Sequence, residues 1–386
     1  MKIFILLPRI PYPLEKGDKL RAFNQLRSLS KTNEIHLCAL NDTHINPDAI
    51  KTLQQFCKSI HILPLPFYKR ISNIFFCFFN GKPFQVGYFF NKENLKIINH
   101  IIKEIQPDRI YCQLLRVAEY VKNQNIKKIF DYQDVFSKGV ERRINTTPFY
   151  FKPFFKSEYK RLLRYENKVF DWFDEKIIIS FPDRELIPHP ERNKIHVIPN
   201  GVDSEFFKPI SQNKDYELLF TGNMGYPPNI NSAQFLVKKI MPLVWEKIPD
   251  VKLLLAGANP SSEVLSMASD KVIVSGWVND MRDCYARAKI FIAPMQIGTG
   301  LQNKLLEAMA MKLPCITSPL ANNALQATEN KEILIGNSPE EYAQHILNLH
   351  SDIKKTTLLA EQGYNFVINN FNWENVNYKL NQIICS

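Results

Sequence analysis

Residues 298–319 combine the residue types and the spacing of an anion-binding site. Gly298, Thr299 and Gly300 form a short glycine turn, and a run without proline or β-branched residues follows from Leu301 to Met311. We expect this run to be a helix, and the first N–H groups of a helix lack intrahelical partners and favour negative charge. The stretch therefore predicts a site for a phosphate-bearing ligand.

Lys304 and Glu307 stand three residues apart in this run, so they share one face of the expected helix. A cation near the turn can meet the phosphates of a nucleotide diphosphate, and a carboxylate one turn deeper can accept hydrogen bonds from ribose hydroxyls. The alternative is an exposed ion pair on a surface helix. The glycine turn before the pair and the strand-like segments on both sides favour the nucleotide site.

Two series of alternating strands and helices are expected to position these residues. The first half predicts strands at Ile3–Leu7, Ile35–Leu40, Ile60–Leu63, Arg109–Cys112, Lys128–Phe130 and Ile177–Ser180. The second half predicts strands at Ile195–Ile198, Glu217–Phe220, Val251–Ala256, Val272–Val274, Ile290–Ala293 and Cys315–Thr317. This alternation predicts an α/β fold with two doubly wound, Rossmann-like domains that face a cleft.

The domain organisation follows from a proline-rich stretch at 181–193, which is expected to be a linker. We predict an N-terminal, acceptor-side domain at 1–185 and a C-terminal, nucleotide-binding domain at 186–365. Residues 366–386 predict a terminal amphipathic helix that packs back toward the N-terminal domain. Several predicted strands of the second half end at glycines, among them Gly222 followed by Asn223, as expected where a ligand approaches backbone.

Polar residues also follow strands of the first half. Gly17, Asp18 and Arg21 come after the first strand, where Asp18 is placed to cap a helix and Arg21 to face the mouth of a crevice. Asp131 and Asp134 end a later strand and are candidates to orient an acceptor hydroxyl. The alternatives, an ordinary capped loop in the first case and loop capping in the second, stay open.

The charge is concentrated in the first half of the chain. Residues 1–185 hold 31 lysines and arginines against 19 acids, and residues 186–386 hold 18 against 19. Two stretches, 66–90 and 148–168, interleave aromatic and basic residues, which suits contact with an anionic membrane surface. A helix that packs its aromatic residues inward is the alternative. Nucleic acid is not expected as a partner, because no nucleic-acid motif accompanies the stretches.

The cysteines and the hydropathy pattern exclude several classes of protein. The seven cysteines are scattered without a C-x-x-C pair, which is typical of reduced core residues in a cytoplasmic protein. The acids lack the spacing of a metal cage. No apolar run approaches the length of a membrane-spanning helix. We therefore expect no metal and no cofactor, and a cytoplasmic protein that attaches peripherally to the inner face of the plasma membrane.

Four motifs of the second half, in this order, resemble one known family. They are VIPNGVDSEFF at 197–207, LLFTGNMGYPPNINSAQFL at 218–236, VIVSGWVNDMRDCYARAKIFIAPM at 272–295 and GTGLQNKLLEAMAMKLPCITS at 298–318. Together they are similar to the "group 1" retaining glycosyltransferases of the GT-B fold, which assemble bacterial polysaccharides. RIPYPLEKGDKLRAFNQLRSLS at 9–30 looks like the sugar transferases of exopolysaccharide clusters.

The resemblance implies transfer of a sugar from a nucleotide diphosphate sugar to a hydroxyl of a glycan or lipid-linked acceptor, with retained configuration. It implies that Gly276, Trp277 and Val278 lie near the base and that Glu307 holds the ribose. We expect Lys304 and the N–H groups of residues 298–300 to stabilise the departing diphosphate, with help from Arg9 or Lys16. Gly17 is expected to let its loop approach the donor phosphate.

The chain departs from the family pattern in two places. Of the two glutamates that the family often carries with seven residues between them, Glu307 matches the second, and Thr299 stands in place of the first. The usual arginine and lysine after the first strand of the nucleotide domain are missing from 223–234, so Lys304 is expected to neutralise the diphosphate in their place. The alternatives are a sugar-nucleotide epimerase of the same fold and a non-catalytic nucleotide-binding scaffold.

Overall fold

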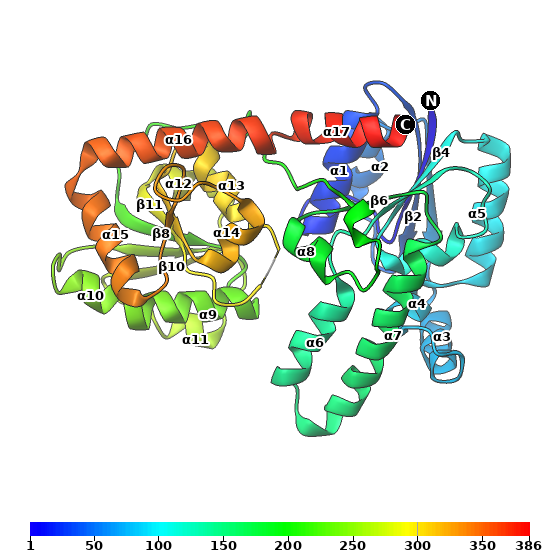
Figure 1. Cartoon of the computed structure of the whole chain (residues 1–386), viewed down its shortest axis with the longest axis horizontal. Coiled ribbons are helices and arrows are strands. Elements are labelled where there is room, and N and C mark those ends of the chain that lie inside the picture. Colours follow the sequence, from blue (N-terminus) through cyan, green and yellow to red (C-terminus); the bar gives the residue numbers. More distant parts are fainter. Residues whose placement is uncertain (299) are drawn as a thin grey trace. The chain divides into compact units, whose positions relative to one another are not determined.

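The computed structural model describes residues 1–298 and 300–386, apart from the side chains of residues 145 and 146. The chain divides into two compact units (Figure 1). Unit 1 comprises Met1–Pro199 and Asn377–Ser386, and unit 2 comprises Asn200–Val376. Each unit is an α/β assembly with its own parallel sheet and its own hydrophobic core.

The described residues of unit 1 form a seven-stranded sheet in the order β3-β2-β1-β4-β5-β6-β7, with every pair parallel. Its strands are β1 (Lys2–Leu7), β2 (Glu34–Asn41), β3 (Ser59–Pro64), β4 (Arg109–Gln113), β5 (Lys128–Asp131), β6 (Glu175–Ile178) and β7 (His196–Val197). The central strand β1 is buried from Ile3 to Leu7 without alternation, as expected for a parallel strand that is covered on both faces.

The helices of unit 1 connect these strands and cover the sheet. They are α1 (Gly17–Leu29), α2 (Pro47–Leu53), α3 (Phe67–Asn80), α4 (Phe84–Phe89), α5 (Lys92–Ile105), α6 (Phe136–Thr146), α7 (Lys152–Phe170) and α8 (Phe181–Leu186). Short 3₁₀ turns lie at η1 (Leu115–Tyr120), η2 (Phe149–Phe151) and η3 (Arg192–Lys194). In Figure 1, α3 and the α6–α7 hairpin extend from the same side of unit 1.

The described residues of unit 2 form a six-stranded parallel sheet in the order β10-β9-β8-β11-β12-β13. Its strands are β8 (Tyr216–Thr221), β9 (Leu253–Ala256), β10 (Val272–Gly276), β11 (Ala288–Ala293), β12 (Cys315–Thr317) and β13 (Leu334–Ile335). The strand order reverses between β8 and β11, as it does between β1 and β4 in unit 1. Ligands of doubly wound sheets bind beyond the carboxyl ends of the strands at such a reversal.

The helices of unit 2 are α9 (Pro227–Phe235), α10 (Met241–Trp245), α11 (Ser262–Leu265), α12 (Met281–Ala286), α13 (Asn303–Ala310), α14 (Pro319–Leu325), α15 (Pro339–Ser351) and α16 (Ile353–Phe371). A π-helical segment, η4 (Leu236–Ile240), joins α9 to α10 just before Pro242. Proline lacks the N–H that would continue an α-helical ladder, so the wider turn occurs where that donor is missing.

The last helix, α17 (Trp373–Cys385), ends in unit 1. Its residues Leu380 and Ile384 are fully buried, and Asn377 donates to the carbonyl of Asn24 at 3.1 Å. Arg109 donates to the carbonyl of Ile384 at 3.0 Å. The terminal segment is therefore part of the packing of unit 1.

One predicted strand belongs to the other sheet. Ile195–Ile198 was expected to open the second domain, but its residues His196–Val197 form β7 and pair with β6 of unit 1. The prediction was wrong because an edge strand of only two residues carries too little sequence signal to show which sheet it joins. The stretch 181–193, which was expected to be a linker, contains α8 and η3.

The length and hydropathy of the helices show whether any of them could span a membrane. No helix among residues 1–298 and 300–386 is both long enough and apolar enough to cross a membrane.

Candidate functional site

The carboxyl ends of three neighbouring strands of unit 2 are held together by backbone contacts. The N–H of Gly222 donates to Ala256 at 3.0 Å, and the N–H of Gly257 donates to Gly276 at 3.2 Å. A Cβ on Gly257 would lie 1.9 Å from the carbonyl oxygen of Gly222. Only glycine allows this approach, so the loops after β8, β9 and β10 share one backbone floor.

The helix that follows β11 begins later than the sequence suggested. α13 starts at Asn303, not at Leu301, because Gln302 is extended with φ −91° and ψ 99°. Gln302 makes no side-chain cap, and its amide instead donates to the carbonyl of Gly300 at 2.9 Å. Gly298 has φ +105°, a conformation that glycine adopts readily. Thr299 lies outside the described residues.

Lys304 lies on the first turn of α13 and points to the end of β8. Its Nζ donates to Oδ1 of Asn229 at 2.6 Å and lies 4.4 Å from the ring centroid of Phe220. Asn229 in turn donates to the carbonyl of Asn223 at 2.9 Å. A Cβ on Gly222 would lie 3.0 Å from the lysine nitrogen. The ammonium group is thus seated directly on the glycine floor.

Glu307 lies one turn further along α13. Its Oε2 accepts a hydrogen bond from the hydroxyl of Tyr285 at 2.7 Å, and that hydroxyl is 3.1 Å from Oγ1 of Thr221. Tyr285 is fully buried on α12. Glu307 is only half-buried, and no hydrogen bond to its Oε1 comes from the residues that the structure describes. One carboxylate oxygen is anchored, and the other keeps its lone pairs for a ligand.

Burial acts on both charges. It lowers the pKa of Lys304 to about 7, against the opposing effect of Glu307. It raises the pKa of Glu307 to about 7, against the hydrogen bond from Tyr285 and the charge of Lys304. The pair therefore sits where water stabilises its charges poorly, and an anion beside Lys304 would stabilise the ammonium form.

The loop after β10 carries an exposed aromatic ring. Trp277 follows Gly276 and is 76% exposed, and its indole N–H donates to Asn279 at 3.3 Å. Val278 packs against the core of unit 2, which anchors the loop below the ring. An exposed indole beside a strand end is suited to stack on a planar base. Gly276 connects this loop through Gly257 to the floor under Lys304.

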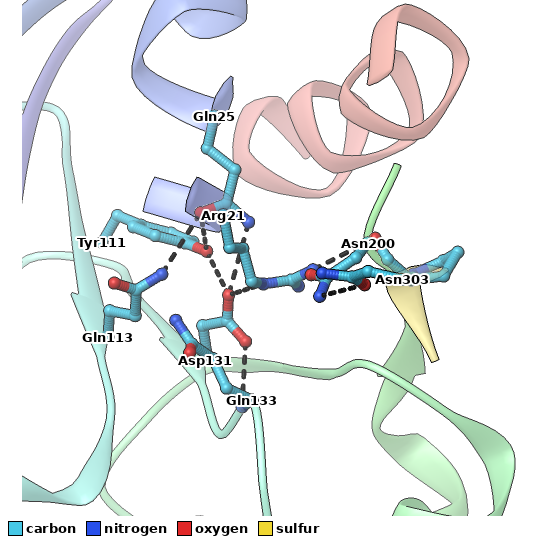
Figure 2. A network of polar contacts seen from close by, with 9 residues as sticks. Arg21, Gln25, Tyr111, Gln113, Asp131, Gln133, Asn200 and Asn303 are labelled. Carbon is cyan, nitrogen blue, oxygen red and sulfur yellow. Dashed lines mark hydrogen bonds and ion pairs between the residues drawn. The ribbon is translucent and has the colours of Figure 1, made fainter. Parts of the chain in front are cut away.

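Asp131 of unit 1 is at the centre of a buried polar network (Figure 2). Its Oδ2 pairs with Nε of Arg21 at 2.7 Å and lies 2.6 Å from the hydroxyl of Tyr111. Gln25 donates to the same oxygen at 3.3 Å, and the backbone N–H of Gln133 donates to Oδ1 at 3.1 Å. The carboxylate thus joins α1 to the ends of β4 and β5, while its contact with an acceptor stays a prediction.

The other candidate residues of the first half lie at or near the surface of unit 1. Asp134 is exposed and its Oδ1 accepts from the N–H of Val135. Gly17 is exposed, and a Cβ there would meet nothing within 4 Å. Asp18 does not cap α1, because the helix begins at Gly17 and its N-cap is Lys16; Asp18 lies in the first turn and pairs with Arg9 at 3.2 Å.

Arg21 does not face a crevice, contrary to the sequence prediction. Its side chain is fully buried, and besides Asp131 it donates to the carbonyl of Pro199 at 3.1 Å. A buried guanidinium needs several acceptors, which strand ends supply and a solvated loop does not.

A cavity of about 390 Å³ lies beyond the carboxyl ends of β1 and β2. Its lining includes Arg9, Lys16, Lys19 and His44. Arg9 and Lys16 are the two cations that the sequence suggested for a phosphate. The cavity therefore brings both cations to the carboxyl end of the sheet.

Sequence reasoning missed the partners of the site residues. Asn229 falls in the stretch that lacks the cations of the family, and it is the residue that holds Lys304. Tyr285 is a lone tyrosine in a short helix, and nothing in its sequence neighbourhood signals its bond to Glu307. Among residues 1–298 and 300–386, no group of three or more His, Cys, Asp or Glu residues is arranged to hold a metal ion.

The comparisons with known proteins point to one class of enzyme. Residues 215–352 match the family model Glycosyl transferases group 1. The chain is 24% identical over 398 residues to an uncharacterized 44.6 kDa protein in the cps region of Klebsiella pneumoniae, with 97% of each chain covered. It is 26% identical over 198 residues to the Escherichia coli UDP-Gal:alpha-D-GlcNAc-diphosphoundecaprenol alpha-1,3-galactosyltransferase, covering 46% of this chain and 51% of that protein.

The fold comparison covers the whole chain. The Anabaena protein Alr3699/HepE, solved in complex with UDP, superposes with a TM-score of 0.71 over 100% of both chains at 12% identity. Two parallel-sheet α/β units of this kind define the GT-B fold of glycosyltransferases. The chain has this fold, and its residues 215–352 are similar to the group 1 glycosyltransferases.

The buried network of unit 1 makes a stability prediction. Asp131→Asn leaves the guanidinium of Arg21 without its counter-charge, so we expect a loss of about 3–5 kcal/mol in the free energy of unfolding. Asp134→Asn, at an exposed position, is the matched control and is expected to change it by less than about 0.5 kcal/mol. Urea unfolding followed by circular dichroism measures both. Equal stability of the two variants would show that Asp131 is not a structural anchor.

Proposed function

We propose that the protein transfers a sugar from a nucleotide diphosphate sugar to a hydroxyl of a glycan or lipid-linked acceptor, with retention of the anomeric configuration. The reaction is assigned to cell-surface polysaccharide synthesis in the cytoplasm, at the inner face of an anionic membrane. The cps-region relative from Klebsiella pneumoniae and the E. coli enzyme, whose name gives a diphosphoundecaprenol-linked acceptor, support this assignment.

The observation that carries the proposal is the Lys304–Glu307 pair at the strand reversal of unit 2. Lys304 is seated on backbone between β8 and α13, and Glu307 presents an oxygen from the same face of that helix. In the proposed complex, a diphosphate binds beside the ammonium group of Lys304 and a ribose binds beside the carboxylate of Glu307. Trp277 follows β10, two strands from β8 in the sheet, and is proposed to stack on the base.

Cleavage of the donor's glycosidic bond puts negative charge on the departing diphosphate. Lys304 and the backbone N–H groups of the turn at 298–300 are proposed to stabilise that charge. Fixed donors contribute most where little water competes with them, and the lowered pKa of Lys304 indicates such a place. Because a side-chain cation serves the diphosphate, we propose that the reaction requires no metal ion. Transfer is then expected to continue in the presence of EDTA.

The acceptor is assigned to unit 1. The cavity beyond β1 and β2 carries Arg9 and Lys16, which suit a phosphate-bearing acceptor or the donor diphosphate. Asp134, which is exposed, is the more accessible of the two aspartates proposed to orient the acceptor hydroxyl. Asp131, the last residue of β5, is proposed to support the loop that carries Asp134.

Removal of Lys304 tests the site directly. Lys304→Ala is expected to lower the rate of donor hydrolysis or transfer by about 10²–10³-fold, the usual loss on removal of one donor to a developing charge. Lys312→Ala, at a half-exposed lysine two residues after α13, is the matched control and should keep the wild-type rate. The measurement is release of nucleoside diphosphate from a panel of sugar nucleotides. If the wild-type protein releases nucleoside diphosphate from none of these sugar nucleotides, the transferase proposal is contradicted and a nucleotide-binding role is favoured.

The pKa of Lys304 predicts how donor affinity depends on pH. The free lysine is largely protonated below about pH 7, so a diphosphate finds a cation there; above it, binding must take up a proton. We expect affinity to fall by up to tenfold per pH unit above about pH 7, where the free lysine loses its proton. Calorimetric titration with UDP at several pH values measures this.

Two variants separate this effect from other titrations. Lys304→Gln should bind more weakly and without the decline above neutral pH. Glu307→Gln removes the charge that raises the lysine pKa, so its decline should begin at lower pH. A decline that persists unchanged in Lys304→Gln would contradict the assignment.

The stereochemistry of the product tests the retaining mechanism. Once a donor is found, ¹H NMR of the product formed early in the reaction should show the anomeric configuration of the donor sugar. A product with the inverted anomeric configuration would contradict the retaining mechanism but would not contradict the proposed donor site.

A further inference from the structure

Helix α3 turns its apolar side chains away from the protein. Of its fourteen residues only Cys77 is buried, and Phe67, Ile71, Phe75 and Phe79 are 53–76% exposed. Positions 67, 71, 75 and 79 recur every four residues, so they form one stripe along the helix. A surface helix of a globular protein normally places such a stripe on the core.

The start of α7 exposes a second group of aromatic rings. Phe149, Tyr150 and Phe151 in η2 are 53–82% exposed, and Phe154 in the first turn of α7 is 40% exposed. Stacking joins this group to α3, since Phe84 lies 4.9 Å from Phe78 and 4.8 Å from Phe154 between ring centroids. The two groups therefore belong to one face of unit 1, which we call the aromatic face.

Charged side chains of α7 fix the arrangement of this face. Glu158 accepts from the backbone N–H groups of Phe84 and Gln85 at 2.8 and 3.2 Å, at the start of α4. Arg161 donates to the carbonyl of Lys82 at 3.0 Å and also to that of Cys77 near the end of α3. α7 thus holds both ends of the α3–α4 loop, so the rings are presented by a built surface and not by a loose segment.

The exposed charges of α7 are basic. Lys156, Lys160, Arg164 and Lys168 are exposed at intervals of four along α7 and form a continuous cationic stripe. The acids of α7, Glu158 and Glu166, are buried.

The exposed acids nearby each pair with a lysine. Glu93 pairs with Lys69 at 2.8 Å, and Glu141 pairs with Lys138 at 2.8 Å. The face therefore carries exposed apolar rings and a net positive border.

A cavity of about 620 Å³ opens beside α3 within this face. Phe76 and Phe79 line it together with Lys69, Lys82 and Lys92, and its lining also includes one acid, Glu93, the partner of Lys69. An amphiphile whose head is a phosphate and whose tail is apolar matches both halves of this lining. Free phosphate would match only the lysines.

We propose that the aromatic face docks the protein on an anionic phospholipid bilayer, with the rings of α3 and η2 inserted at headgroup level and the α7 stripe against the lipid phosphates. Exposed aromatic rings bordered by lysines have the composition of interfacial membrane contacts. The inference rests on the proposed function only for the lipid-linked acceptor, which such docking would bring within reach of unit 1.

Vesicle binding tests the proposal. The wild-type protein should float with vesicles of phosphatidylcholine and phosphatidylglycerol and bind much less to phosphatidylcholine alone. Phe75→Ser with Phe79→Ser should weaken binding to the anionic vesicles at least tenfold. Ile353→Ser with Leu358→Ser, at exposed apolar positions of α16 in unit 2, is the matched control and should bind like wild type.

The cationic stripe is tested in the same assay. Lys156→Gln, Lys160→Gln and Arg164→Gln together should lower binding by about a hundredfold, at roughly fivefold per cation near an anionic surface. Lys238→Gln with Lys239→Gln, at exposed lysines of unit 2, controls for net charge. Phe75→Trp should fluoresce less with brominated acyl chains than with unbrominated ones, because the ring enters the bilayer.

Several outcomes would overturn the proposal. One is binding of the wild-type protein that does not depend on phosphatidylglycerol; another is unchanged binding by the α3 variant, with folding verified by circular dichroism. A third is a wild-type dimer in sedimentation that the α3 variant breaks without any vesicle binding, which would make the face a contact between two copies.

The test separates docking from the reaction. The α3 and α7 variants should keep donor hydrolysis in solution, since none of their residues lies in the unit 2 site. If the wild-type protein hydrolyses the donor but does not bind vesicles, only the docking proposal is contradicted. If it binds vesicles but does not hydrolyse any donor, only the proposed function is contradicted.

Discussion

The hydrogen bond between Lys304 and Asn229 depends on how closely backbone can pack at the strand reversal of unit 2. Gly222 and Gly257 bring two strand ends into direct contact, and the ammonium group lies over the first of them. A side chain at Gly222 would reach the amide of Asn229 at 2.6 Å and displace the lysine. The position of the cation therefore depends on the absence of side chains beneath it.

The two units handle their buried charges in opposite ways. In unit 1 the carboxylate of Asp131 is surrounded by protein donors, so its charge is already compensated. In unit 2 the hydrogen bonds of Lys304 to Asn229 and of Tyr285 to Glu307 involve neutral groups, and burial shifts the pKa of each charged residue toward its uncharged form. A buried charge with a counter-charge stabilises a fold, whereas buried charges held by neutral groups favour a ligand that compensates them. This contrast separates a structural anchor from a binding site, although both lie at strand ends.

The sequence predicts most of the strands because they are short apolar runs, and in a parallel sheet such runs are buried on both faces. It fails where that signal is weak. Leu334–Ile335 is too short to stand out, and His196–Val197 was assigned to the wrong sheet because two residues do not specify a partner. The helix after β11 was predicted two residues too early, since propensity cannot detect the extended backbone of Gln302.

The candidate site divides along the same line. The types and spacing of Lys304 and Glu307 are local and can be read from the chain, and so can the glycines that end the strands. Asn229 and Tyr285 reach the site only through tertiary packing, from helices 75 and 22 residues away in sequence. Asp131 and Asp134 look equivalent in sequence, but one points into a fully buried network and the other to solvent. Side-chain direction at a strand end depends on the residues packed behind it, and for Asp131 these are Arg21 and Gln25 of α1, more than a hundred residues earlier.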